Sequence, residues 1–167
     1  REDPPDVRRV AVEHDLRVRG PFDLAVWTDG SARGGVHDAG ARIVLRNCRT
    51  GGVHLFARPA GGHGNSYAAE CTAIHAALGY LGDRRLITEN CKVLFATDSQ
   101  AAVRRLQAGA AAQRDGMMRE VWERLRWIFP IDGDATATVM YVCGHAGCMY
   151  NEMADVAART GSRMSQD

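Results

Sequence analysis

Apolar and polar residues alternate along the first third of the chain with the period of two that is typical of β-strands. Three segments show this alternation: residues 23–29, 39–46 and 53–58. In the first of them, Leu24 and Val26 fall on one side and Trp27 on the other. That strand is expected to end at Asp29, because Gly30 opens a glycine-rich stretch that favours a turn. Three strands in succession with short turns predict an antiparallel meander.

The period then lengthens to that of amphipathic helices. Helices are predicted over about 66–81, from Asp98-Ser99 to Gly109 and over 117–129, strands over 92–97 and 136–142, and a last helix from Asn151 to about Thr160. The order of elements is β-β-β-α-β-α-α-β-α. Because a meander is followed by βαβ crossovers, the predicted fold class is α/β, with a five-stranded mixed sheet flanked by helices.

The length of 167 residues fits one domain with a single core. We expect residues 1–21 to form an N-terminal tail or linker, 22–161 the domain, and 162–167 a C-terminal tail. The first twenty residues lack the apolar core of a signal peptide, and no apolar stretch approaches the roughly 18 residues of a membrane span. The chain begins with Arg1 rather than Met, so we expect it to be a piece of a longer protein that has no contact with membranes.

Net charge and cysteine usage say little about the partner of this chain and somewhat more about its compartment. The net charge of +1 does not by itself indicate a nucleic-acid partner. Five cysteines without a C-x-x-C pair argue against a closed set of disulfides, which favours a reducing, intracellular compartment, nucleus or cytoplasm. Cys143, His145 and Cys148 offer three zinc ligands, but a structural zinc site requires four, so zinc is not expected.

Four acidic residues stand at positions from which side chains reach the edge of a sheet. Asp29 and Asp98 end predicted strands, Glu70 lies one turn into a helix, and Asp155 lies early in the last helix. Each has a structural explanation as a turn, a cap or a helix-dipole partner. If the first and fourth strands are parallel neighbours, however, Asp29 and Asp98 lie side by side at the carboxyl edge, where open α/β sheets bind ligands. Clustered carboxylates repel one another, and hard divalent cations such as Mg²⁺ or Mn²⁺ remove that repulsion.

Four segments add a specific resemblance. They are TDGS at 28–31, AAECTAI at 68–74, ATDSQAAV at 96–103 and GHAGCMYNEMADVAA at 144–158. In this order and at this spacing the chain resembles the ribonuclease H family (type 1-like) over about residues 22–161. The first, third and fourth segments most resemble the ribonuclease H domains that retrotransposons carry, which implies a covalently linked reverse transcriptase domain in the full-length protein.

The resemblance implies roles for the acids and for one histidine. Asp29 bridges two metal ions, Glu70 and Asp98 complete one metal site, and Asp155 belongs to the other. The ions are two Mg²⁺, bound fully only with substrate, and Mn²⁺ can substitute. His145 protonates the leaving group or helps the product leave. The implied reaction is endonucleolytic hydrolysis of the RNA strand of an RNA–DNA hybrid.

The same resemblance implies the residues that hold the hybrid. RNA differs from DNA by the 2′-hydroxyls displayed in its minor groove. The residues expected to contact sugars or base edges flank the acids: Gly30, Ser31, Ser66, Gln100 and Asn151.

Two alternatives stay open at this point. The chain could be a catalytically silent ribonuclease H-fold module that serves as a spacer or assembly surface, or a related two-metal DNA nuclease or transposase. All four acids are present, which argues against the silent module. The related nucleases and transposases lack the GHAG-x-x-x-NE-x-AD segment that this chain has. Residues 107–117 are too few for the extra basic helix that some family members use to grip the hybrid, so the isolated domain, expected to be a monomer, should bind it weakly.

Overall fold

The computed structural model describes residues 21–32, 39–59, 66–114 and 116–142. Its strands are β1 (Leu24–Ala32), β2 (Ala39–Asn47), β3 (Val53–Pro59), β4 (Lys92–Thr97) and β5 (Thr136–Tyr141). Its helices are α2 (Ser66–Asp83), α3 (Gln100–Gln107) and α4 (Gly116–Ile128), with a single 3₁₀ turn, η1 (Ala110–Ala112), between the last two. The eight predicted strands and helices before residue 143 are therefore confirmed, and the helix predicted from Asn151 lies outside the described residues.

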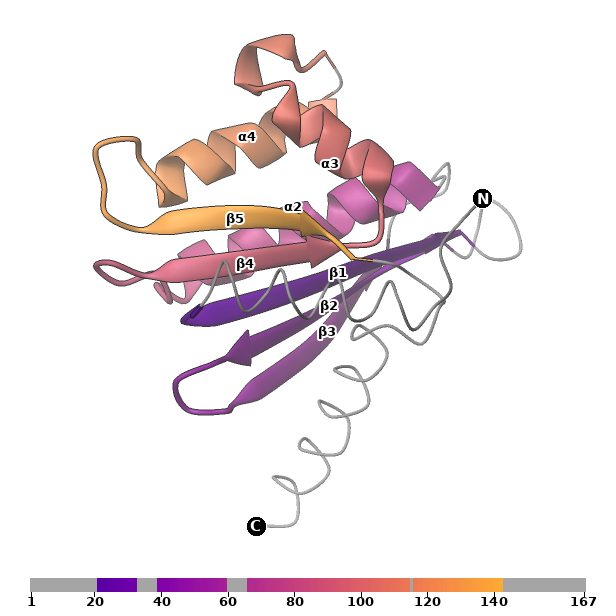
Figure 1. Cartoon of the computed structure of the whole chain (residues 1–167). Coiled ribbons are helices and arrows are strands. Elements are labelled where there is room, and N and C mark those ends of the chain that lie inside the picture. The colour runs from indigo at the N-terminus through magenta and orange to yellow at the C-terminus, as the bar shows by residue number, and fades with distance from the viewer. Residues whose placement is uncertain (1–20, 33–38, 60–65, 115, 143–167) are drawn as a thin grey trace, which may run out of the picture.

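The five strands form one mixed sheet in the order β3-β2-β1-β4-β5 (Figure 1). The pairs β1–β2 and β2–β3 are antiparallel, which is the predicted meander. The pairs β1–β4 and β4–β5 are parallel. The helix α2 joins β3 to β4, and α3 and α4 lie between β4 and β5 in the chain. Parallel pairing of β1 with β4 puts their carboxyl ends at the same edge of the sheet. This is the condition under which Asp29 and Asp98 were expected to lie side by side.

The period-two pattern of β1 separates two layers of core. Leu24 and Val26 belong to the larger core between the sheet and the helices, together with side chains such as Ile43 and Leu78. Trp27 belongs to a second cluster on the opposite face of the sheet, with Val44 as one of its neighbours. Because both faces are buried, the register of β1 is fixed from both sides, and a slip by one residue would exchange the two sets.

The helices lie on one face of the sheet, where α2 packs behind the strands and α3 and α4 stand above β5 (Figure 1). Ser99 caps α3, because its Oγ accepts a hydrogen bond of 3.1 Å from the N–H of Ala102. Gly109 has a φ of 87°, a left-handed conformation that favours glycine, and α3 has ended by then as predicted. Among the described residues no helix is long and apolar enough to cross a membrane.

The predicted end of the first strand is wrong. β1 continues past Asp29 to Ala32, and Gly30 pairs with Ala41 of β2. Glycine does not break the strand here because the antiparallel partner β2 still offers its backbone hydrogen-bonding groups on that side. The pairing with β4 does stop at Thr28. Asp29 is therefore the first residue of β1 beyond its parallel partner. It lies at the carboxyl edge of the parallel strands, as predicted.

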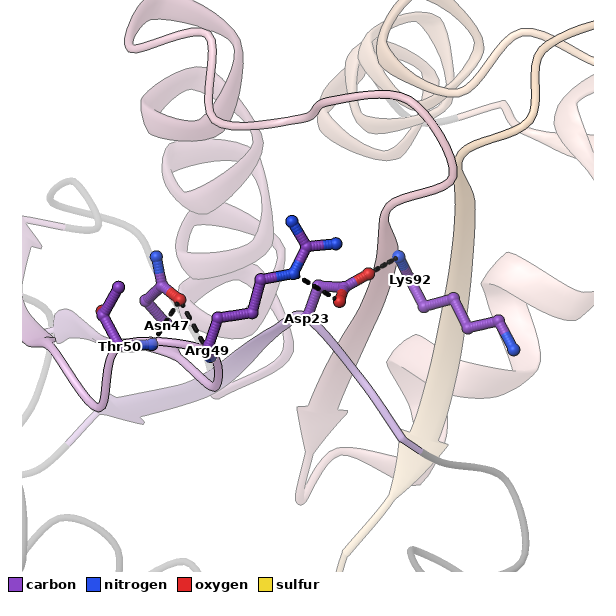
Figure 2. A network of polar contacts seen from close by, with 5 residues as sticks. All are labelled: Asp23, Asn47, Arg49, Thr50 and Lys92. Atoms are coloured by element: carbon purple, nitrogen blue, oxygen red, sulfur yellow. Dashed lines mark hydrogen bonds and ion pairs between the residues drawn. The ribbon is translucent and has the colours of Figure 1, made fainter.

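The opposite, amino-terminal end of the same two strands is joined by Asp23 (Figure 2). Its Oδ2 accepts a hydrogen bond of 2.8 Å from the backbone N–H of Lys92, and its Oδ1 accepts one of 2.8 Å from the Nε of Arg49. Asn47 shapes the β2–β3 turn that carries Arg49, since its Oδ1 accepts from the N–H groups of Arg49 and Thr50 at 3.0 and 3.2 Å. These contacts tie the start of β1 both to β4 and to the turn.

Candidate active site

Three of the four predicted acids meet at the carboxyl edge of the parallel strands. Asp29 comes from β1, Asp98 follows the last residue of β4, and Glu70 lies on the first turns of α2. Each offers a carboxylate oxygen, and these oxygens all lie within 4.8 Å of one another. Asp29 and Asp98 are half-buried, whereas Glu70 is 1% exposed. The site therefore has one interior carboxylate and two that stand at its mouth.

A pair of threonines underlies the interior carboxylate. Thr28 and Thr97 immediately precede the two aspartates, are partners in the parallel register, and are both buried. The Oγ1 of Thr97 donates a hydrogen bond of 2.7 Å to Oε1 of Glu70, and the Oγ1 of Thr28 donates to the same oxygen. The two strands thus bind the carboxylate of α2 at one point, where all three elements meet.

Burial raises the pKa of the Glu70 carboxyl above its usual value, because removal from water disfavours the charged form. The hydrogen bonds from Thr28 and Thr97 act in the other direction, and the neighbouring charges of Asp98 and Asp29 raise the pKa further. A carboxyl group with a raised pKa beside two other carboxylates gains most from a bound cation, since the cation favours the charged form of all three.

The three carboxylates fit a divalent cation in chemistry and in size. All of the donors are oxygens, which select hard ions of the Mg²⁺, Mn²⁺ or Ca²⁺ kind. Two oxygens on opposite sides of one Mg²⁺ lie about 4.2 Å apart, given metal–oxygen distances of about 2.1 Å. The 4.8 Å that bounds the present cluster needs only small side-chain movements or a bridging water to match. The geometry therefore supports divalent-metal binding without distinguishing Mg²⁺ from Mn²⁺.

The remaining predicted site residues divide into two groups. Gly30 and Ser31 lie on the part of β1 that extends beyond β4, Ser66 begins α2, and Gln100 begins α3 with an exposed side chain. All four positions are within a few residues of the acids at the same edge of the sheet. His145, Asn151 and Asp155 lie outside the described residues, as do Cys143 and Cys148 of the zinc alternative.

Sequence reasoning missed three residues of the site. Thr28 and Thr97 carried a usable signal, because Thr-Asp recurs at the ends of the two strands that were expected to be neighbours. Arg42 carried none: only the register shows that it is the cross-strand partner of Asp29. Directly opposed residues project from the same face of a sheet with Cβ atoms about 5 Å apart, so the exposed Arg42 shares that face with Asp29.

The structure thus defines an α/β protein with a mixed five-stranded sheet and three carboxylates clustered at the ends of its parallel strands. Comparison with solved structures places this fold more closely. The chain is similar to LC11-RNase H1, solved in complex with an RNA/DNA hybrid, with a TM-score of 0.55 and 20% identity over 72% of this chain and 86% of that one. It is also similar to RNase H1 from the halophilic archaeon Halobacterium salinarum NRC-1, with a TM-score of 0.55 and 24% identity over 80% and 92% of the two chains.

Sequence comparison gives the family. The family model of RNase H matches residues 22–163. The chain is 31% identical over 154 residues to a ribonuclease H of Nitratidesulfovibrio vulgaris (strain DP4), which covers 83% of this chain and 88% of that protein. The chain belongs to the ribonuclease H family, and the resemblance inferred from its four segments is confirmed.

Proposed function

We propose that this chain hydrolyses the RNA strand of RNA–DNA hybrids by a metal-dependent mechanism with two divalent ions. The observation that carries the proposal is the convergence of Asp29, Glu70 and Asp98 at the carboxyl edge of β1 and β4. Membership of the ribonuclease H family supplies the reaction class, and a neighbour in the fold, LC11-RNase H1, was solved with an RNA/DNA hybrid.

The carboxylates account for what the protein contributes to such a reaction. Two divalent ions, when bound, would supply an activated water and stabilise the negative charge on the departing oxygen of a phosphodiester. The chain would position them from fixed elements: Asp29 from a strand buried on both faces, and Glu70 from a helix packed against that strand. Asp155 is proposed as the fourth ligand and His145 as the proton donor, on the strength of their motif alone.

Positive charge beside the acids supports a phosphate-bearing substrate. Arg42 is exposed and lies opposite Asp29, so its guanidinium can meet a phosphate that approaches the metal site. Gln100 is exposed at the start of α3, next to Asp98, where an amide can bind a sugar hydroxyl or a base edge. Ser31, Ser66 and Asn151 are proposed for the same task from the motifs. We propose no equivalent grip from the α3–α4 connection, where the described residues hold only the short turn η1.

The setting of this activity stays a prediction. A linked reverse transcriptase domain of a retrotransposon rests on the style of the segments at 28–31, 96–103 and 144–158. An intracellular location, in the nucleus or the cytoplasm, rests on cysteine usage. Of the described cysteines, the exposed Cys48 and the buried Cys91 are in no disulfide. The sequence of the complete gene tests the first point, because a reverse transcriptase reading frame must adjoin these residues.

Cleavage of a labelled RNA–DNA hybrid with Mg²⁺ or Mn²⁺ tests the proposed reaction. Single-stranded and double-stranded RNA serve as competing substrates, and only the hybrid should be cut. Asp98→Asn should abolish cutting and leave the metal-free melting temperature equal or higher, because one repulsive charge is lost. Equal cleavage of all substrates would favour a less selective two-metal nuclease, and an inert wild-type protein with an intact fold would favour a structural module.

A further inference from the structure

Both strands that lead to the aspartates of the described cluster also contact the Oε1 oxygen of Glu70. Thr28 of β1 and Thr97 of β4 both donate their hydroxyl protons to it. These threonines each stand one residue before an acid, and they are partners in the parallel register. We propose that Thr28 and Thr97 are positioning residues for the metal site, which fix the Glu70 carboxylate in one orientation toward Asp29 and Asp98.

The direction of the hydrogen bond from Thr97 is set by its surroundings. Its Oγ1 accepts a hydrogen bond of 3.1 Å from the backbone N–H of Ser99, and its own proton is then directed to Glu70 at 2.7 Å. Ser99 is held in turn as the N-cap of α3. The hydroxyl of Thr97 therefore transmits the position of the β4–α3 turn, which also carries Asp98, to the carboxylate of α2.

The buried setting makes this arrangement costly to replace. Thr28, Thr97 and Glu70 are each 1% exposed, so water cannot substitute for a missing hydroxyl without a rearrangement of the core. A buried carboxylate needs hydrogen-bond donors or a cation, and the two hydroxyls provide donors whether or not an ion is bound. Groups that orient metal ligands in this way typically change metal affinity by about 10–100-fold when they are removed.

Each threonine offers a matched pair of substitutions. Thr97→Val keeps the β-branched shape and removes the hydroxyl, whereas Thr97→Ser keeps the hydroxyl and removes a methyl group. Thr28→Val and Thr28→Ser give the same contrast on β1. If the hydroxyl matters, the valine variants should be impaired and the serine variants should not. If only packing matters, the serine variants should be impaired and the valine variants should not.

The measurement is a calorimetric titration of Mn²⁺ into the metal-free 167-residue protein without nucleic acid, with thermal unfolding in EDTA as the check on folding. We expect each valine variant to bind Mn²⁺ about tenfold more weakly than wild type, and each serine variant to stay within about twofold. The Mn²⁺ concentration for half-maximal cleavage should shift by the same factor. If one valine variant fails to fold, the other carries the test.

Two results would overturn the assignment in different ways. It rests on the metal site of the proposed function, so wild-type protein that neither binds Mn²⁺ nor cleaves the hybrid with Mn²⁺ would remove that site and the positioning role together. Wild-type protein that binds Mn²⁺, with folded valine variants that bind it equally well, would remove the positioning role and leave the metal site intact. A valine variant with a lower melting temperature but unchanged Mn²⁺ affinity would show that the hydroxyl serves stability alone.

Discussion

At the amino ends of β1 and β4 a single aspartate is neutralised by its neighbours, whereas at their carboxyl ends three carboxylates face one another. Asp23 accepts hydrogen bonds from the backbone N–H of Lys92 and from Arg49 (Figure 2), and these contacts hold its pKa below the usual value. Glu70, between Asp29 and Asp98, has its pKa raised by burial. The first arrangement stabilises the fold by itself. The second gathers like charges, which repel one another, and a bound divalent cation would relieve that repulsion.

The largest expected difference between the two ends is in activity. Asp29→Asn should reduce hybrid cleavage by at least about a thousandfold, because each 1.4 kcal/mol of lost transition-state stabilisation is tenfold and a metal ion contributes several. Asp23→Asn, six residues earlier and just before β1, should leave kcat unchanged and lower the melting temperature. Steady-state cleavage assays and thermal unfolding measure the two effects. Loss of cleavage in folded Asp23→Asn protein would contradict the division.

Stabilisation by metal should depend on the carboxylates at the carboxyl ends of β1 and β4 and not on Asp23. Mn²⁺ at ten times its Kd should stabilise the wild-type protein by about 1.4 kcal/mol, which corresponds to a rise in melting temperature of about 3–6 °C. The same addition should leave Asp98→Asn nearly unchanged, while Asp23→Asn should respond like wild type. Differential scanning calorimetry with and without EDTA makes the comparison. A full response in Asp98→Asn would place the ion elsewhere.

Removal of the interior charge should alter how stability depends on pH. Because the folded pKa of Glu70 lies above its ordinary value of 4.5, the stability linked to this group is fully present below that value and is lost as the pH rises through the folded pKa. Glu70→Gln should therefore melt above wild type in metal-free buffer at pH 7, by a margin that shrinks toward pH 4. Melting curves across this range test the sign, and a variant that melts below wild type at pH 7 would refute it.

Asp23 should show the smallest effect, with the opposite sign. Its folded pKa lies below 3.8, so its stabilising contribution is present above that value and is lost as the pH falls through the folded pKa. Asp23→Asn should melt below wild type at neutral pH and approach it in acid. High salt should narrow the neutral gap in part, since Arg49 is exposed at the surface and its attraction is screened.

Local pattern was sufficient for the elements and for the identity of the acids. The alternation in 23–29 and 39–46 gave the correct faces for Val26 and Ile43, because burial on both sides of a sheet imposes a period of two. Asp98 at the end of a short apolar strand pointed to the correct edge. The end of β1 was misplaced at Asp29, since a glycine signal describes local backbone preference and the partner strand β2 overrides it.

The orientation of Glu70 was beyond the reach of the sequence. Helical periodicity put it on α2 but could not show that its carboxylate turns inward to two threonines, because that depends on how α2 packs across β1 and β4. Arg42 was missed for a similar reason. Its position opposite Asp29 follows from the backbone hydrogen bonds between β1 and β2. The pattern of these bonds does not depend on which side chains the strands carry.

The sequence by itself determined which residues could do the chemistry: the acids, their order and the Thr-Asp repeat are all written in the chain. Only the tertiary structure decided that β4 lies beside β1, that Thr28 stands level with Thr97, and that Glu70 closes the cluster. These are contacts between segments 27 to 69 positions apart in the chain, and their register is selected by the packing of a shared core. Local preference has no access to that energy, which exists only once the sheet and α2 are assembled.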